Sequence, residues 1–342
     1  MTHSRRYFIK SSAGLALMSA LPGCASLSTP GRTPVAFADI PRSEYGFATT
    51  ADEVLADIDL SGKTVLITGC NSGLGYQSMR AMAAKGAHVI GTARTQEKAD
   101  TACKSVQGMT TPLVCELTNM DSVVACADAV NKIGAPIDIL ICNAGVMALP
   151  KLEQVDVSGV MLERQFVINH LGHYLLTRKV LPQVQAADTP RIVMVSSLGY
   201  TLAPEGGIQF DNLSGDNGYQ AFKNYGQTKL ANILFAKELD RRYFDAGISS
   251  NAIHPGLVST NLGRYITGRM PDPNKPLRKG QKTAVQGAST QVYVGTDPRL
   301  EGVSGFYFED CNPVATKGGY ADDPALALKL WDVSEELVQA YL

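Results

Sequence analysis

The sequence has almost no net charge, because 31 lysines and arginines face 32 aspartates and glutamates. Such a chain offers no electrostatic basis for binding nucleic acid. It has no apolar run of the ~20 residues that a membrane-spanning helix needs. No two of its seven cysteines show the C-x-x-C spacing of zinc and redox sites, and it has no internal repeat. These absences argue against a nucleic-acid binder, an integral membrane protein, a zinc module and a repeat protein.

What is present is the composition of a globular protein. Hydrophobic residues make up 45% of the 342 residues and charged residues 18%, which is enough for a sizeable core. Length alone suggests about two domains, but α/β units often run longer as one domain. Several cysteines lie within apolar patterns, where a buried free thiol is the ordinary interpretation, so we do not expect disulfides.

The first residues have the features of an export signal. Ser4-Arg5-Arg6 is followed by Phe8 and Lys10, and a short apolar stretch covers residues 13–21. A charged start and an apolar stretch too short to span a membrane are typical of signal peptides. The Ser-Arg-Arg-x-Phe-x-Lys pattern resembles a bacterial twin-arginine signal. We therefore expect a signal peptide over residues 1–24 and export to the periplasm or cell envelope. The alternative is a basic, disordered N-terminus on a cytoplasmic protein.

Two processing sites are candidates. Leu21–Cys24 (LPGC) resembles a lipoprotein box in which Cys24 would carry a lipid anchor, although proline is unusual there. Ala36–Ala38 (AFA) has the small-x-small spacing of a cleavage site but lies far behind the apolar stretch. Residues 25–45 are rich in Ser, Thr, Pro and Gly and indicate a linker. The folded domain is therefore expected to span residues 46–342.

A strand, a glycine-rich turn and a helix follow one another directly. Residues 64–68 form a short β-branched run, residues 69–75 read GCNSGLG, and residues 76–85 have a helical pattern closed by Gly86. In this context the glycines let a pyrophosphate approach the backbone, and the helix N-terminus offers unpaired N–H groups. A tight turn without a ligand is the alternative, but the context favours dinucleotide binding.

The second strand predicts which dinucleotide binds. It covers residues 87–92 and ends in Ala93-Arg94-Thr95. An acidic residue near this position holds the ribose 2′-hydroxyl of NAD, whereas an arginine suits the 2′-phosphate of NADP. Arg94 therefore favours NADP, the alternative being a solvent-exposed arginine without a ligand.

Strands and helices alternate through the rest of the chain. Strands are predicted over residues 111–115, 137–142, 191–195, 248–253 and 305–308, and helices over 122–132, 161–180, 219–243, 282–293 and 324–341. This order predicts a single-domain α/β fold with a doubly wound parallel sheet. Ligands bind at the carboxyl ends of such strands, where Asn143-Ala144-Gly145 and Ser196-Ser197 fall. Residues 198–218 are predicted to form a loop, and residues 261–279 a mobile lid.

Two of the predicted helices carry candidate functional residues. Tyr225 and Lys229 lie four residues apart and hence on one helix face, where a phenol beside an ammonium is suited to proton transfer. Asn169, His170 and His173 lie on the helix predicted over residues 161–180. The two histidines share a face, as a metal pair would, but no third ligand has a suitable spacing. We interpret both histidines as structural.

Several motifs together resemble those of the short-chain dehydrogenases/reductases, a family with the Rossmann fold. They are, in chain order, Thr68-Gly69-x-x-x-Gly73-x-Gly75, Asn143-Ala144-Gly145, Asn169, Ser197 and Tyr225-x-x-x-Lys229. The resemblance runs from about residue 48 to the end. Residues 225–239, 305–311 and 330–332 are more particularly similar to the retinol dehydrogenase and WW-domain oxidoreductase branch. The light-dependent protochlorophyllide reductases are a nearby branch.

The resemblance implies a role for each motif. Tyr225 would be the general acid in reduction and the general base in oxidation, with Lys229 lowering its pKa and holding the nicotinamide ribose. Ser197, rather than Ser196, would hydrogen-bond the substrate oxygen, and Asn169 would support a water that relays protons to Lys229. The expected cofactor contacts are Gly69, Asn71, Ser72, Gly73, Leu74, Gly75, Arg94, Glu116, Leu117, Asn143, Ala144, Gly145, Tyr225, Lys229, Pro255, Gly256, Val258 and Thr260.

These features predict an NADP-dependent oxidoreductase that interconverts a hydrophobic alcohol and its aldehyde or ketone, with NAD as the alternative cofactor. Met147, Leu149, Leu198 and Leu202 are candidates for an apolar substrate pocket. Glu116 stands where many relatives have Asp, which puts its adenine contact in question. A homodimer is a candidate assembly.

Three other functions are alternatives to this prediction. The first is a catalytically silent NAD(P)-binding sensor or scaffold, and the second is a protochlorophyllide-reductase-like double-bond reductase. The third is a sugar epimerase or dehydratase, which also uses a Tyr-x-x-x-Lys pair. That group spaces its glycines as G-x-x-G-x-x-G, whereas this chain has G-x-x-x-G-x-G, so the spacing disfavours it.

Overall fold

The structure, a computed structural model, describes residues 33–268, 270 and 276–342. The predicted signal peptide over residues 1–24, including Cys24, lies outside the described residues. So do residues 269 and 271–275 of the predicted lid. Within the described ranges, none of the helices is long and apolar enough to cross a membrane.

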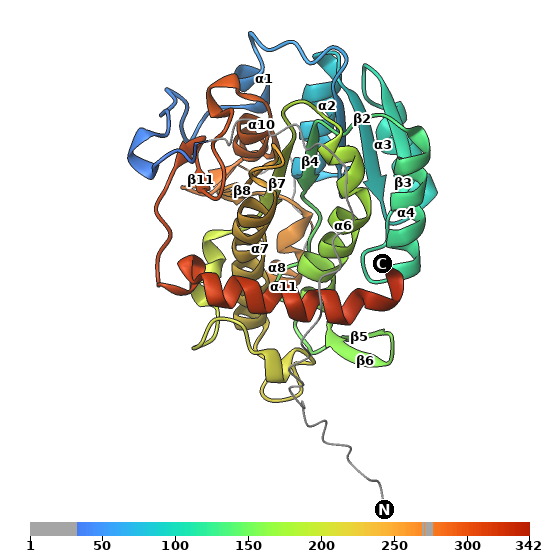
Figure 1. Cartoon of the computed structure of the whole chain (residues 1–342), viewed down its shortest axis with the longest axis vertical. Coiled ribbons are helices and arrows are strands. Elements are labelled where there is room, and N and C mark those ends of the chain that lie inside the picture. The colour runs from blue at the N-terminus through green and yellow to red at the C-terminus, as the bar shows by residue number, and fades with distance from the viewer. Residues whose placement is uncertain (1–32, 269, 271–275) are drawn as a thin grey trace, which may run out of the picture. The chain divides into compact units, whose positions relative to one another are not determined.

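An eight-stranded sheet forms the centre of the described chain, in the order β12-β11-β8-β7-β4-β1-β2-β3 (Figure 1). Its strands are β1 (Thr64–Ile67), β2 (His88–Ala93), β3 (Thr110–Val114), β4 (Ile139–Cys142), β7 (Arg191–Val195), β8 (Ser249–His254), β11 (Tyr307–Glu309) and β12 (Asn312–Pro313). Every neighbouring pair is parallel except β11–β12. β1 and β4 are buried throughout, as expected for a parallel sheet covered on both faces. The predicted α/β fold is confirmed.

Helices cover both faces of this sheet. On one face lie α1 (Ala51–Val54), α2 (Gly73–Ala84), α3 (Gln96–Lys104) and α10 (Ser289–Thr296). On the other lie α4 (Met120–Ile133), α6 (Gly172–Gln185) and α7 (Ala221–Tyr243). α11 (Pro324–Val338) crosses the outside of α7 (Figure 1).

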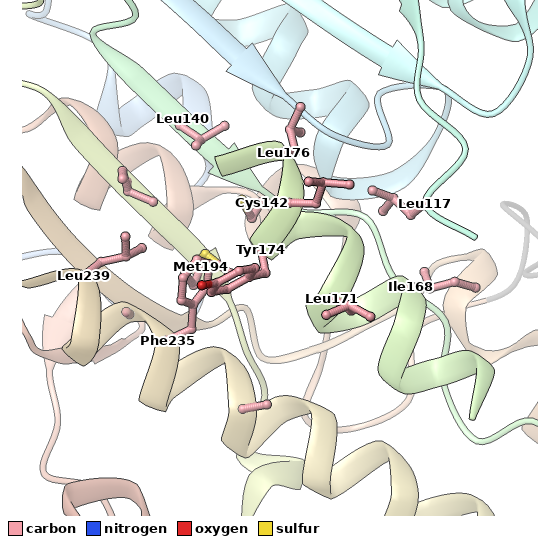
Figure 2. Close-up of a cluster of buried hydrophobic side chains, with 14 of the residues drawn as sticks. Leu117, Leu140, Cys142, Ile168, Leu171, Tyr174, Leu176, Met194, Phe235 and Leu239 are labelled. Atoms are coloured by element: carbon pink, nitrogen blue, oxygen red, sulfur yellow. The ribbon is translucent and has the colours of Figure 1, made fainter. Parts of the chain in front are cut away.

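An aromatic cluster holds α7 in place. The rings of Tyr174 on α6 and Phe235 on α7 are 5.1 Å apart, and Trp331 of α11 lies 5.1 Å from Tyr174. Figure 2 shows Tyr174 and Phe235 together beside Met194 of β7. Aromatic pairs of this kind contribute about 0.5–1.5 kcal/mol beyond their buried area. The cluster therefore stabilises the helix that carries Tyr225 and Lys229.

The helix predicted from Met161 is wrong at its start. Met161 lies in β6 (Val160–Glu163), which forms an antiparallel hairpin with β5 (Gln154–Val157). The two-residue turn between them, Ser158-Gly159, has φ values of +53° and +84°, as the tight hairpin turns require. Helical structure begins with α5 (Arg164–Phe166) and passes through a wide π turn over Val167–Leu171 before α6.

Other elements also differ from their predicted bounds. α3 had no counterpart in the prediction, and the loop predicted over residues 198–218 contains 3₁₀ helices at Leu198–Leu202 and Phe210–Asn212. The helix predicted over residues 282–293 is divided into β10 (Gln281–Lys282), α9 (Ala284–Gly287) and α10. β10 pairs with β9 (Leu257–Val258), and α8 (Arg264–Thr267) lies within the predicted lid.

The predicted linker over residues 25–45 extends too far into the folded domain. Ile40 is only 4% exposed and belongs to the core under α1 and α10, after a 3₁₀ helix at Phe37–Asp39. The ring of Tyr45 packs edge-on against Tyr293 at 5.9 Å. A Ser- and Pro-rich composition predicts a linker and gives no sign of these few apolar contacts. The folded domain therefore begins before residue 46.

Candidate active site

The glycine turn and the loop after β4 are joined through Thr68. Thr68 Oγ1 accepts hydrogen bonds from Asn143 N at 2.9 Å and from Ala144 N at 3.0 Å. In return, Asn143 Nδ2 donates to Thr68 O at 2.8 Å. The carboxyl ends of β1 and β4 are adjacent in the sheet, so these bonds bring Asn143-Ala144-Gly145 to the glycine turn.

His173 joins this network through both of its ring nitrogens. Its Nε2 lies 2.8 Å from Thr68 Oγ1, and its Nδ1 lies 3.1 Å from Asn169 O. A carbonyl can only accept, so Nδ1 carries the proton, and Thr68, which already accepts two N–H groups, donates its hydroxyl proton to Nε2. Burial lowers the pKa of His173 to about 4, which keeps this tautomer neutral. His170, by contrast, pairs its Nε2 with Ser334 Oγ at 2.9 Å.

The glycine turn has the shape of a phosphate cradle. A Cβ added to Gly75 would lie 2.4 Å from Gly69 O and 2.5 Å from Asn143 Nδ2, so only glycine allows this approach. Gly69 has a φ of +73°, which also favours glycine. α2 begins at Gly73 without a side-chain cap from Ser72, which leaves its first N–H groups open to a ligand. These residues fit the pyrophosphate of a dinucleotide.

The other cradle residues predicted from the resemblance surround this turn. Leu74 is half-buried in the first turn of α2, and Asn71 is exposed beside it. Gly145 approaches both Asn169 and Lys229, since a Cβ there would lie 3.1 Å from Asn169 Oδ1 and 3.7 Å from Lys229 Nζ. The glycine turn and the predicted catalytic residues therefore form one continuous site.

Asn169 lies in the π turn and uses its side chain structurally. Its Oδ1 accepts from Val146 N at 2.8 Å, and its Nδ2 donates to Val146 O and Thr228 Oγ1, both at 2.9 Å. Thr228 precedes Lys229 on α7, so Asn169 ties the loop after β4 to the helix that carries Tyr225 and Lys229. Sequence reasoning missed Thr228, because a threonine inside a helix has no distinctive pattern.

Ser197 and Tyr225 face one another. Ser197 follows β7, and its Oγ accepts from Gly199 N at 3.0 Å, which begins a 3₁₀ helix. Burial raises the pKa of Tyr225 to about 12, and a hydrogen bond from Ser197 opposes that shift. Ser196 is turned away, because its Oγ donates to Lys229 O at 2.7 Å. The structure thus places Ser197, and not Ser196, beside the phenol.

Lys229 lies under the tyrosine ring, with Nζ 5.6 Å from the ring centroid of Tyr225. Nζ donates to Val195 O at 2.9 Å, and burial lowers the pKa of Lys229 to about 8. The expectation that Lys229 lowers the pKa of Tyr225 is not met in this structure. Burial dominates there, and the pKa of the phenol stands above its ordinary value.

The loop after β8 reaches back to the glycine turn. A Cβ on Gly73 would lie 3.4 Å from Thr260 Cγ2, so Thr260 closes over the start of α2. Pro255 and Gly256 follow β8 directly, and Val258 belongs to β9 and packs against Gly287. The predicted nicotinamide-side residues therefore lie next to the phosphate cradle.

Three residues predicted for the adenosine end have different surroundings. Arg94 is exposed just after β2, and within the described ranges its side chain has no ion-pair partner. The carboxylate of Glu116 accepts from Thr118 N at 3.2 Å and Thr118 Oγ1 at 2.9 Å, so it is turned toward its own loop. Leu117 is buried in the core shown in Figure 2, where only its backbone can meet a ligand.

Comparison with known proteins agrees with this geometry. A family model described as short chain dehydrogenase matches residues 63–270. Short-chain dehydrogenase TIC 32 B of Brassica napus is 38% identical over 311 residues, covering 87% of this chain and 96% of that protein. Human retinol dehydrogenase 14 is 38% identical over 302 residues, covering 82% and 87%. A crystal structure of an uncharacterised protein from Mycobacterium paratuberculosis has a TM-score of 0.68 at 30% identity, covering 85% and 98%.

Proposed function

We propose that this protein reduces a hydrophobic aldehyde or ketone with NADPH. The chain belongs to the short-chain dehydrogenase/reductase family and is an NAD(P)-dependent oxidoreductase. The observation that carries the proposal is the buried Tyr225 phenol, which faces Ser197 and has Lys229 Nζ 5.6 Å from its ring centroid. A sensor or scaffold has no need of a buried phenol in that position.

Each residue of the centre has a distinct task. Bound NAD(P) supplies or accepts the hydride. Ser197 Oγ would donate a hydrogen bond to the substrate oxygen as charge develops there, and Tyr225 would deliver its proton to that oxygen. Lys229, with a pKa of about 8, is mostly protonated at neutral pH and would hold the cofactor ribose. Asn169 holds the loop after β4 against α7 through its hydrogen bonds to Val146 and Thr228.

The pKa of Tyr225 supports reduction as the favoured direction. With a pKa of about 12, the phenol is protonated at neutral pH and can act as an acid, whereas oxidation requires its conjugate base. We therefore expect oxidation of the alcohol to speed up as pH rises, and reduction to prevail near pH 7.

Apolar residues that follow Ser197 in the chain support a lipophilic substrate. A cavity of about 480 Å³ is lined by Leu198, Tyr200, Ala203 and Leu230, together with the polar Thr201 and Lys317, and Ser197 itself does not line it. Leu198 directly follows Ser197 and is 40% exposed, so apolar surface lies close to the reacting atoms. Leu149, another predicted pocket residue, is buried in the hydrophobic core. The exposed Arg94 supports NADP, because its guanidinium is available for a 2′-phosphate.

Turnover of purified protein tests the proposal. NADPH or NADH would be mixed with retinoid, steroid and aliphatic carbonyls, and absorbance at the nicotinamide band would be followed. Tyr225→Phe should lower kcat by about 10²–10⁴-fold while leaving cofactor affinity unchanged. Tyr243→Phe, at the other end of α7, is the matched control and should retain activity. Full activity of Tyr225→Phe would disprove the mechanism.

The place of action remains a separate proposal, carried by the N-terminal sequence alone. We infer twin-arginine export to the periplasm or cell envelope, with a lipid anchor on Cys24 as the weaker inference. Mass spectrometry of the mature N-terminus distinguishes an acylated Cys24, cleavage after Ala38 and an intact start. An intact, cytoplasmic protein would refute export.

A further inference from the structure

The loop after β8 packs against a buried lysine, Lys282. Gly256 has a φ of +89°, and a Cβ there would lie 3.0 Å from Cδ and Cε of Lys282. Lys282 belongs to β10, which pairs with β9, and its carbonyl accepts from Ser259 N at 3.0 Å. The loop over residues 255–260 therefore rests on both the backbone and the stem of Lys282.

The position of Lys282 depends in turn on Asp310. The Lys282 side chain has no exposed surface, and its Nζ forms an ion pair with the Asp310 carboxylate, which is 34% exposed. On another side, Nζ lies 5.2 Å from the centroid of the Phe47 ring. Burying an ammonium without a counter-charge is costly, so the lysine can stay under the loop only while Asp310 meets it.

Asp310 lies in a hairpin turn that the N-terminal segment contacts. Asp310 and Cys311 form the two-residue turn between β11 and β12, and their φ values of +49° and +59° are those that tight hairpin turns require. Ser43 Oγ donates to Cys311 O at 2.8 Å. Asn312 Nδ2 donates to Tyr45 O at 3.0 Å and to Asp310 O at 3.1 Å. Contacts from Ser43 and Tyr45 thus hold the turn that carries the Asp310 carboxylate.

We propose that the Lys282–Asp310 pair is a positioning device that holds the loop over residues 255–260 in place for the nicotinamide half of the cofactor. The proposal rests on the proposed function in one respect, that this loop receives the nicotinamide end. The phosphate cradle is held by other contacts, those of Thr68 and Asn143. Loss of the pair should therefore affect one half of the cofactor and spare the other.

The test compares a whole cofactor with a fragment that lacks the nicotinamide. In the double variant Lys282→Met/Asp310→Asn, both charges are removed while an unbranched stem remains under Gly256. Affinity would be measured by titration calorimetry for NADPH and for adenosine 2′,5′-bisphosphate, or for NADH and AMP if the wild type prefers NADH. We expect the Kd of the whole cofactor to rise about 10-fold and that of the fragment to change less than about 2-fold.

Two outcomes would overturn the proposal: an unchanged Kd for the whole cofactor, or a parallel rise for cofactor and fragment, as general destabilisation would give. If the double variant does not fold, Lys282→Gln serves instead, because it removes the charge of the pair and shortens the stem under Gly256 while its amide stays polar, and the same split is expected. Asp52→Asn, in the exposed Arg80–Asp52 pair, is the control and should change neither affinity. Binding needs no turnover, so a failure to reduce carbonyls would leave this comparison interpretable.

Discussion

Two buried polar clusters support the two halves of the site, and they do so by different means. Under the glycine turn, Thr68, His173 and Asn169 form a neutral network in which each hydrogen has one acceptor. Under the loop after β8, Lys282 and Asp310 form an ion pair. The neutral network is strong because every group is satisfied, whereas the ion pair persists because the fully buried Lys282 ammonium cannot be left without a counter-charge. Removing one member should therefore harm the two clusters for different reasons.

The largest effect is expected from His173→Leu. It leaves the Thr68 hydroxyl proton and one lone pair of the Asn169 carbonyl without partners in the interior. The free energy of unfolding should fall by about 2–4 kcal/mol. Urea denaturation measures this loss. His88→Leu is a matched control, because His88 also pairs with a threonine hydroxyl, at 2.8 Å, but is only half-buried. Equal losses in both variants would refute the network's special role.

Next comes Asp310→Ala, which leaves the Lys282 ammonium buried and unpaired. Breaking a buried pair costs about 3–5 kcal/mol, and because Asp310 is 34% exposed we expect about 2–3 kcal/mol. Asp52→Ala removes the partner of the exposed Arg80 and should cost less than about 1 kcal/mol. Thermal unfolding would rank the two variants. A loss for Asp310→Ala as small as the control's would mean that water already screens Lys282.

Acid should destabilise the neutral network. The pKa of His173 is about 4 in the folded protein and near 6.5 when unfolded, so between those values the unfolded state binds more protons. Stability is thus lost as pH falls from 6.5 to 4. In His173→Gln this loss is absent, and its deficit against the wild type should narrow by about 2 kcal/mol over that window. Glu163, with a pKa of about 7, acts in the opposite direction but cancels in the comparison. A constant deficit would contradict the neutral state assigned to His173 in the folded protein.

The smallest effect is expected from Gly256→Ala. Its φ of +89° strains any side chain, and the new Cβ would press on the flexible stem of Lys282, for about 1–2 kcal/mol in all. Gly62→Ala separates the two causes, because Gly62 has a φ of +78° but open space around it. We expect only Gly256→Ala to weaken cofactor binding. If Gly62→Ala does so equally, strain alone accounts for the result.

Much of the fold could be predicted because its signals are local. The apolar runs of β1, β4 and β7 are short, continuous and bounded by turn residues, which is typical of parallel strands covered on both faces. The hairpin β5–β6 could not be predicted, because its strands have four residues each and its Ser158-Gly159 turn is a weak signal. The linker boundary was wrong for a similar reason, since Ile40 is buried, and Tyr45 half-buried, only by partners distant in the sequence.

For the site, the sequence by itself predicted which residues carry the chemistry. Spacing within one turn or one helix, which decides how side chains face, indicated the glycines of the cradle and the Tyr225–Lys229 pair, and the family resemblance indicated Ser197. Only the tertiary structure decided what holds them. Lys282 and Asp310 are 28 residues apart, His173 and Thr68 are 105 apart, and no local pattern marks either pair. The pKa of Tyr225 likewise could not be predicted from the sequence, because it depends on how much water the surrounding elements exclude.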